Sequence, residues 1–325
     1  PVPYTLPPGV LREELRTQNQ NIRQNEQSLA LRVQDLESEG ARAVFKNIRI
    51  DMRQYENLEM FLHLDNGNFP DQSVEDGEIE AFVRFGVDFT QNYYEVRLPM
   101  TVTQQSINPS AEEVWPGENN LRINLELLQK IKSEVLGDPN LNPGDLNLFN
   151  ESVLGNAVVG PNEHVYGIKG NPNFGDIRSL MIGVRNASGD LVSGEVWFNE
   201  MRLSGLKNQG GYAAVMSMDA NIADFASISA TGRRSTIGFG AIEQGPQERS
   251  RENVTQYDVT TNLSLGKLLP EKWGVSLPFS YSIGVETITP QFDPQFEDIE
   301  LETRLNNANS DDDRDKIREQ SEDYT

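Results

Sequence analysis

Few side chains of this 325-residue chain could take part in catalysis or bind a metal. The sequence contains two histidines, His63 and His164, and no cysteine. Without cysteine there is no thiolate nucleophile, no disulfide, and no cysteine-ligated zinc or iron–sulfur cluster. Two histidines are also too few for a three-histidine metal centre. We interpret them as framework residues, one in a strand and the other near a strand edge.

The motifs that hold ions or phosphates are incomplete. The segment Asp138–Asn142 begins like a calcium-binding EF-hand loop, but Pro143 replaces the required glycine and Phe149 the bidentate glutamate. Gly238-Phe-Gly240 lacks the third glycine of a dinucleotide-binding turn, and neither a P-loop nor a GxSxG nucleophile elbow occurs. The sequence therefore predicts no enzyme activity, no bound metal and no cofactor.

The charge of the chain argues against one class of partner. It carries 28 basic and 50 acidic residues, a formal net charge of −22. Neutralising a phosphate backbone requires clustered lysine and arginine, so we expect no nucleic-acid partner. No run of about 18 apolar residues predicts a membrane-spanning helix, although the short strands of a membrane barrel would escape that test. We expect this chain to be a piece of a longer protein, without a targeting signal to interpret.

Two segments near the carboxyl end, Tyr257–Leu265 and Val275–Val285, alternate apolar and polar residues, with Thr261 as the polar member of the apolar side. Successive side chains of a strand leave opposite faces, so each strand has one apolar side and one polar side. Their lengths match the 9–11 residues of a tilted strand that crosses a bilayer. The predicted lipid-facing residues are Tyr257, Val259, Leu263, Leu265, Val275, Leu277, Phe279, Tyr281, Ile283 and Val285. The predicted lumen-facing residues are Gln256, Asp258, Asn262, Ser280 and Ser282.

Two weaker strand candidates precede these segments. They are Tyr212–Ile222 and a segment from Phe225 that continues through a bend at Thr231–Ser235 to Phe239. Four strands are too few to close a membrane barrel, which needs about eight, so any remaining strands must lie elsewhere. Residues 207–290 are therefore predicted to be barrel-type antiparallel strands. The alternative is a second soluble sandwich whose polar faces contact water.

The first two thirds of the chain have a different pattern. The sequence pattern predicts an extended arm for residues 1–27. For residues 28–206 it predicts a β-sandwich of short strands with one helix near 121–136. The expected strands are Val44–Ile50, Leu58–Leu64, Ile79–Val87, Tyr93–Met100, His164–Lys169, Ile177–Arg185 and Glu195–Leu203. Residues 291–325 predict an acidic loop with a short helix that begins after Asn309-Ser310. The fold class is thus all-β, with a jelly-roll-like sandwich before the barrel strands.

Sandwich domains of this kind often bind sugars through exposed aromatic rings. Tyr93, Tyr94, Trp115 and Tyr166 are the candidates for such a platform. For each of the four, however, we expect packing in the core or in a loop. A soluble cell-surface adhesin or carbohydrate-binding protein is therefore the alternative function. Gly194–Leu203 also resembles the closing strand of galactose-binding-like sandwiches, which concerns the fold and not the ligand.

Several segments, in order along the chain, together resemble one family. They are Tyr4-Thr-Leu-Pro-Pro-Gly-Val10, Asn25-Glu-Gln-Ser-Leu29, Ala41-Arg-Ala-Val-Phe-Lys46, Asp51-Met-Arg-Gln-Tyr55, Gly194-Glu-Val-Trp-Phe-Asn-Glu-Met-Arg-Leu-Ser-Gly205, Thr289-Pro-Gln-Phe-Asp-Pro294 and Asp298-Ile-Glu-Leu301. In these segments the chain is similar to the SprA/Sov family, the outer-membrane translocon of the type IX secretion and gliding machinery of Bacteroidetes.

The resemblance implies a function in protein transport. It implies a giant single-chain barrel in the outer membrane through which folded secreted proteins pass. The implied partners are secreted cargo proteins, PorV-like and plug subunits, and outer-membrane lipid. This chain is a small part of such a barrel, so pore and gate residues are not transferred to it.

Overall fold

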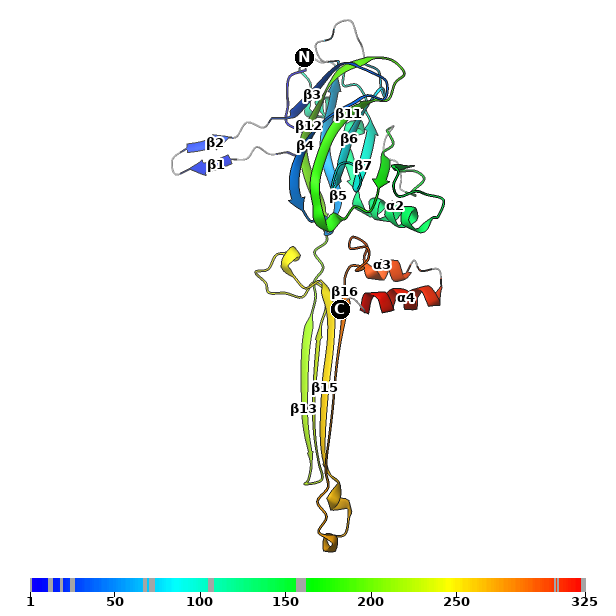
Figure 1. Cartoon of the computed structure of the whole chain (residues 1–325). Coiled ribbons are helices and arrows are strands. Elements are labelled where there is room, and N and C mark those ends of the chain that lie inside the picture. Colours follow the sequence, from blue (N-terminus) through cyan, green and yellow to red (C-terminus); the bar gives the residue numbers. More distant parts are fainter. Residues whose placement is uncertain are drawn as a thin grey trace. The chain divides into compact units, whose positions relative to one another are not determined.

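The computed structural model describes residues 2–10, 14–17, 20–23, 27–66, 69, 74–104, 108–155, 162–306, 308 and 310–322. The chain divides into two compact units, Pro1–Leu206 and Lys207–Thr325, hereafter unit 1 and unit 2 (Figure 1). Antiparallel strands are the main regular structure of both units, which confirms the prediction of an all-β fold.

Unit 1 begins with a segment that contains a hairpin. Strands β1 (Glu14–Thr17) and β2 (Gln20–Arg23) pair with each other in antiparallel register. The predicted extended arm did not include this pairing. Residues 11–13, 18–19 and 24–26 of that arm lie outside the described residues.

Two antiparallel sheets form the body of unit 1 (Figure 1). The first has the order β4 (Ala41–Ile50), β11 (Ile177–Asn186), β6 (Ile79–Gly86), β7 (Tyr93–Pro99), β10 (Val165–Lys169) and β9 (Asn147–Asn150). The second has the order β3 (Leu29–Leu36), β12 (Val192–Leu206), β5 (Tyr55–Asp65) and β8 (Leu121–Asn124). Each predicted strand of this region overlaps one of these strands.

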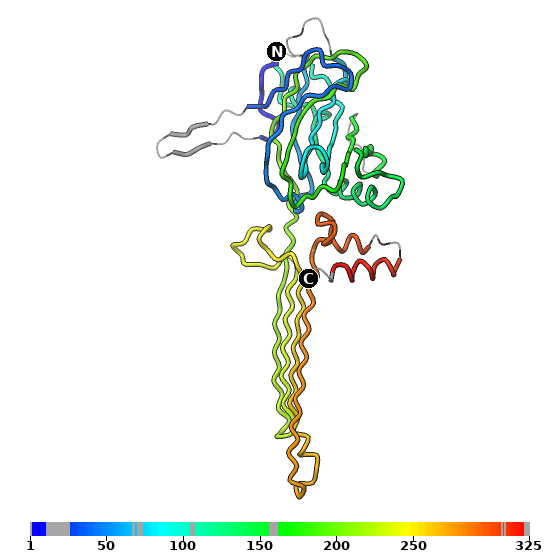
Figure 2. The backbone as a smooth tube through the Cα atoms, viewed as in Figure 1, coloured from blue at the N-terminus to red at the C-terminus, as the bar shows by residue number. Residues whose placement is uncertain are grey.

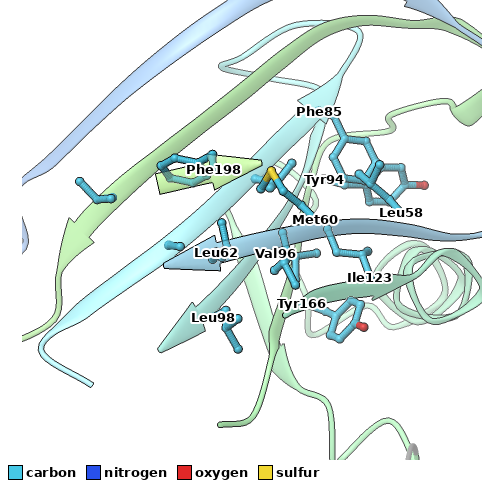
Figure 3. Packing of buried hydrophobic residues seen from close by; sticks show 14 of the residues in the cluster. Leu58, Met60, Leu62, Phe85, Tyr94, Val96, Leu98, Ile123, Tyr166 and Phe198 are labelled. Atoms are coloured by element: carbon cyan, nitrogen blue, oxygen red, sulfur yellow. The ribbon is translucent and has the colours of Figure 1, made fainter. Parts of the chain in front are cut away.

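The two sheets share one hydrophobic core. Leu62 and Phe198 of the second sheet pack in the same cluster as Phe85 and Val96 of the first sheet (Figure 3). The alternating pattern of the strands explains this, because every second side chain points into the space between the sheets. Burial of these side chains is the main favourable term in the folding of unit 1.

The helix of unit 1 begins later than the sequence predicts. Helix α2 spans Leu125–Gly137, whereas the predicted helix began at Leu121. Leu121 and Ile123 lie instead in β8, pair with β5 and are buried. The Asn124 side chain accepts a hydrogen bond from the Glu126 amide and so caps the helix. Pairing with a neighbouring strand therefore replaced the first helical turn.

Short helices complete unit 1. Helix α1 spans Ala111–Val114, with Ser110 and Glu113 forming a capping box. The 3₁₀-helices are η1 (Gly117–Asn119) and η2 (Phe174–Asp176).

The turn between β6 and β7 is organised by a carboxylate. Burial acts to raise the pKa of Asp88, but hydrogen bonds from the Gln91 and Thr90 amides and from Asn92 outweigh it and lower that pKa to about 2. A depressed folded-state pKa contributes stability above the unfolded value near 3.8, and this contribution is lost as the pH falls through about 2.

We expect the amide chemical shifts of Thr90 and Gln91 to titrate with a midpoint near pH 2. The measurement is an NMR pH titration, with the Asp88→Asn variant as a control that should lose this transition. A midpoint near 3.8 would show that the hydrogen bonds do not favour the carboxylate.

Unit 2 is built on a meander of four strands whose order in the sheet is their order in the sequence (Figure 2). They are β13 (Ala213–Ile222), β14 (Ala226–Ser235), β15 (Glu252–Ser264) and β16 (Pro278–Pro290). The predicted bend at Thr231–Ser235 is wrong, because β14 pairs with both neighbours without interruption through Ser235.

The connections of unit 2 contain short helices. The 3₁₀-helix η3 (Pro246–Glu248) lies between β14 and β15, and η4 (Leu265–Leu268) and η5 (Glu271–Trp273) lie between β15 and β16. Helices α3 (Leu301–Asn306) and α4 (Asp311–Glu322) follow β16. α4 begins where a short acidic helix was predicted, and the Ser310 hydroxyl accepts a hydrogen bond from the Asp313 amide. Asn309 of that prediction lies outside the described residues, and α3 was not predicted.

Candidate functional site

The register of unit 2 places the same kind of side chain side by side across all four strands. Met218 pairs with Ala230, Ala230 with Val259, and Val259 with Ile283. Residues that pair in this way point to the same face of a sheet. A row of four paired residues, one from each strand, forms a rung of the sheet. Four rungs are apolar apart from Thr261, and together we call them the apolar face. They are Ile222–Ala226–Leu263–Phe279, Ala220–Ile228–Thr261–Tyr281, Met218–Ala230–Val259–Ile283 and Met216–Gly232–Tyr257–Val285.

Much of the apolar face is accessible in the isolated chain. The exposed fraction is 74% for Met216 and 53% for Tyr281, and Ile222 and Phe279 are also exposed. Single exposed apolar residues are normal on a protein surface, but a contiguous patch over four strands marks a contact with another apolar surface. In water, each square ångström of such area is unfavourable by roughly 25 cal/mol relative to burial.

The opposite side of the sheet, which we call the polar face, carries mostly hydroxyl, amide and charged groups. It consists of Val215, Ser217, Asp219, Asn221, Ser227, Ser229, Thr231, Arg233, Gln256, Asp258, Thr260, Asn262, Ser280, Ser282, Gly284 and Glu286. Val215, which is exposed, is the apolar exception. All five residues predicted to face a lumen lie on it.

Hydrogen bonds link polar side chains on this face. The hydroxyls of Thr260 and Ser282 lie 3.0 Å apart across β15 and β16, and the Ser280 hydroxyl donates to the Asn262 side chain. Both pairs lie directly opposite each other in the strand register. The polar face is thus suited to contact with water, and the apolar face to contact with another apolar surface.

The apolar face has a defined length. Successive rungs are two residues apart, about 7 Å along a strand, so the four rungs span about 20 Å from the first to the last. This is slightly shorter than the apolar band of about 25 Å on membrane barrels. At one end the next rung is mostly polar, with Arg234, Thr255 and Thr287, and the Arg234 guanidinium lies 6.0 Å from the ring centre of Tyr212. Beyond the opposite end, the β15–β16 connection exposes Trp273.

Three predicted lipid-facing residues lie outside the strands. Leu265 begins η4, and Val275 and Leu277 precede β16, which starts at Pro278. The strand boundaries expected for them are therefore wrong. The chain folds into two 3₁₀ turns here, and the second ends at Gly274 with a positive φ of 59°. The other seven lie on the apolar face.

The register also adds residues that the sequence did not single out. Met216, Met218, Ile222 and Ile228 complete the apolar face on β13 and β14. The alternation of these strands is weak because small residues such as Ala220 fill several positions of the face. The pairing partners on β15 are the signal that identifies them.

The two histidines of unit 1 are structural. His63 lies in β5, fully buried, with its ring stacked on Trp197 at 4.3 Å and its Nδ1 2.7 Å from the Val114 carbonyl oxygen. His164 immediately precedes β10 and lies 2.9 Å from a Glu151 carboxylate oxygen. No group of three metal-ligating side chains occurs among the described residues.

The alternative of a sugar-binding aromatic platform does not fit the positions of its four candidate residues. Tyr93, Tyr94, Trp115 and Tyr166 are all buried. Tyr94 stacks on Phe174 with 4.6 Å between ring centres, and the Tyr166 hydroxyl accepts a hydrogen bond from the Asn124 amide. A ring that stacks on a sugar must be open to solvent on one face. The four aromatic residues are therefore packing residues of unit 1.

The fold and the sheet define an all-β protein with a two-sheet unit and an amphipathic four-stranded sheet. Among the described residues, no helix is long and apolar enough to cross a bilayer. A family model described as motility related/secretion protein, SprA_N, matches residues 1–305, and the chain belongs to this family. This confirms the resemblance to the SprA/Sov family and gives the chain a role in secretion and motility. A search of curated proteins found no match.

Proposed function

We propose that this chain is part of a giant outer-membrane β-barrel channel that translocates folded secreted proteins in type IX secretion and gliding motility. The four strands of unit 2 form a section of the barrel wall. The observation that carries the proposal is the register, which gathers apolar side chains of all four strands on one face and polar side chains on the other. Membership of a secretion and motility family supports it.

The energetics of a bilayer explain why such a sheet needs further strands. Every backbone N–H and C=O group in hydrocarbon requires a partner, and a sheet satisfies them all only when it closes. Within the described residues, β13 and β16 each pair on one side only. In the proposed barrel, additional strands pair with both edges.

The proposed mechanism of the channel is physical and involves no catalysis by this chain. The apolar face contacts lipid, and the polar face lines a hydrated lumen wide enough for folded cargo. The proposed partners are secreted cargo proteins, PorV-like and plug subunits and outer-membrane lipid. The energy for transport comes from other components of the machinery.

We further propose that unit 1 is a jelly-roll-like, galactose-binding-like sandwich attached to the barrel wall. Two antiparallel sheets around one core support this proposal. Its strands bury their apolar sides against each other, which is the arrangement of a domain that folds in water.

The absence of cysteine from the sequence allows a direct test of the two faces. Single cysteines are introduced at Val259 and Ile283 on the apolar face, and at Thr260 and Ser282 on the polar face. Each variant receives a nitroxide label in lipid bilayers. We expect positions 259 and 283 to collide with oxygen dissolved in lipid, and positions 260 and 282 to collide with a water-soluble nickel complex.

The matched pairs control for depth, because Val259 with Ile283 and Thr260 with Ser282 are direct neighbours in the register. Equal access of the nickel complex to all four positions would show that both faces contact water, and the proposal would then be wrong.

A further inference from the structure

Strand β4 of unit 1 has an unpaired edge. It is the first strand of the six-stranded sheet and pairs with β11 on one side. In the part of the chain that the structure describes, no strand pairs with its other side. Nine of its ten residues are exposed, and Phe45 is 65% exposed. Such an edge presents free N–H and C=O groups to an added strand.

Two of the usual protections against strand addition, proline and a bulge in the middle of the strand, are missing from β4, so its positive charge is the main protection that it has. β4 contains no proline, and its irregularity lies at one end, opposite Ile177–Ser179. The residues from Ala41 to Asn47 keep a continuous register with β11. Phe45 lies beside Phe89, with 5.2 Å between ring centres, and offers an apolar contact next to the edge.

The charge of β4 distinguishes between possible occupants. The strand carries Arg42, Lys46 and Arg49 and no acidic residue, in a chain with a net charge of −22. Among the described residues, no carboxylate forms an ion pair with Arg42 or Lys46. Pairing of β4 with a second copy of itself brings only positive charges together, and like charges on facing strands are destabilising.

We propose that the unpaired edge of β4 binds an extended acidic segment of a partner protein, which joins the sheet as an additional strand. This mode of binding combines backbone hydrogen bonds with pockets for alternate side chains. The negative charge of the whole chain does not prevent it, because repulsion from distant carboxylates is screened beyond about 8–10 Å at physiological salt.

The side-chain pattern of β4 specifies the partner segment. Arg42, Val44 and Lys46 share one face of the strand, and Phe45 lies on the other. An antiparallel partner segment that complements β4 therefore has, from its amino end, the sequence glutamate, aromatic residue, branched aliphatic residue, small residue, glutamate. This order places its carboxylates opposite Lys46 and Arg42 and its aromatic ring opposite Phe45.

The test uses the full chain and two fluorescein-labelled peptides. The acidic peptide contains the order Glu-Phe-Val-Ala-Glu, and the basic peptide has lysine in place of both glutamates. We expect the full chain to bind the acidic peptide saturably in fluorescence anisotropy, and to bind the basic peptide about tenfold more weakly. The reason is that two attractive cross-strand pairs become repulsive.

A charge-reversed variant of the protein completes the comparison of the two peptides. The double variant Arg42→Glu, Lys46→Glu is expected to reverse the preference and bind the basic peptide about tenfold better than the acidic one. Far-ultraviolet circular dichroism checks that the variant is folded. The control variant Lys207→Glu, Lys272→Glu changes the net charge equally at exposed positions of unit 2 and is expected to leave peptide binding unchanged.

Hydrogen exchange separates strand addition from simple charge attraction. The acidic peptide is expected to slow hydrogen exchange of backbone amides between Ala41 and Asn47, because an added strand accepts hydrogen bonds from them. Charge attraction without strand pairing does not protect these amides. A second variant, Phe45→Ala, is expected to weaken binding several-fold. Lack of saturable binding, equal affinity for both peptides, or binding without slower exchange in β4 would each overturn the proposal.

Discussion

Replacing Ile283 by arginine is expected to destabilise the proposed barrel wall by about 2–4 kcal/mol, the cost of a cationic side chain near the bilayer midplane. Ile283 belongs to one of the two central rungs of the apolar face, so it lies near the middle of that face. The measurement is the denaturant midpoint of the protein in lipid bilayers. The strand neighbour Ser282 is the matched control, because Ser282→Arg places the same charge on the polar face and is expected to be mild.

Depth provides a second comparison on the same face. Phe279 belongs to the outermost rung, next to the β15–β16 connection. Phe279→Arg is therefore expected to cost only about 0–1 kcal/mol, because the long arginine side chain reaches the membrane–water interface from this rung. If Ile283→Arg and Ser282→Arg destabilise the protein equally, the assignment of the two faces is refuted.

Replacing Trp115 by alanine is expected to lower the free energy of unfolding of unit 1 by about 3–5 kcal/mol. Trp115 is 1% exposed and packs with Trp197 and His63, with ring centres 6.2 and 6.1 Å away. Its Nε1–H group donates a hydrogen bond of 2.8 Å to the Thr5 carbonyl oxygen. The substitution removes these contacts, leaves a cavity and releases the segment around Tyr4, whose ring also contacts the indole.

Urea unfolding of the full chain, followed by far-ultraviolet circular dichroism, measures this effect. Trp115→Phe keeps a ring but removes the hydrogen bond, so an intermediate loss is expected. Trp273→Ala is the control, because its side chain is 65% exposed and its removal is expected to change stability by less than about 0.5 kcal/mol. An unchanged midpoint for Trp115→Ala would contradict the packing role.

Local periodicity was a sufficient guide to most strands. The predicted segment Leu58–Leu64 lies within β5, and Ile177–Arg185 lies within β11. Both alternate because successive side chains leave opposite faces of a strand, a property of the local backbone. The same reasoning failed at Leu121–Asn124, where apolar residues spaced for a helix also suit a short strand, and contact with β5 decided between them.

The candidate site was predictable in part for the same reason. Alternation in β15 and β16 correctly separated Tyr257 and Ile283 from Asp258 and Ser282. Leu265, Val275 and Leu277 continue that alternation along the sequence, but two 3₁₀ turns remove them from the sheet. Alternation alone does not show where a strand ends, because the end depends on where the partner strand stops.

The sequence by itself determined that the chain is rich in amphipathic strands, lacks thiol chemistry and resembles one secretion family. Only the tertiary structure decided that Met216 and Met218 join Val259 and Ile283 on one face, and that Trp115 is buried instead of open to a ligand. It also showed that β4 has an unpaired edge. The physical reason is that alternation follows from neighbouring residues, whereas a shared face, burial and a free edge depend on which distant strands pair and in what register.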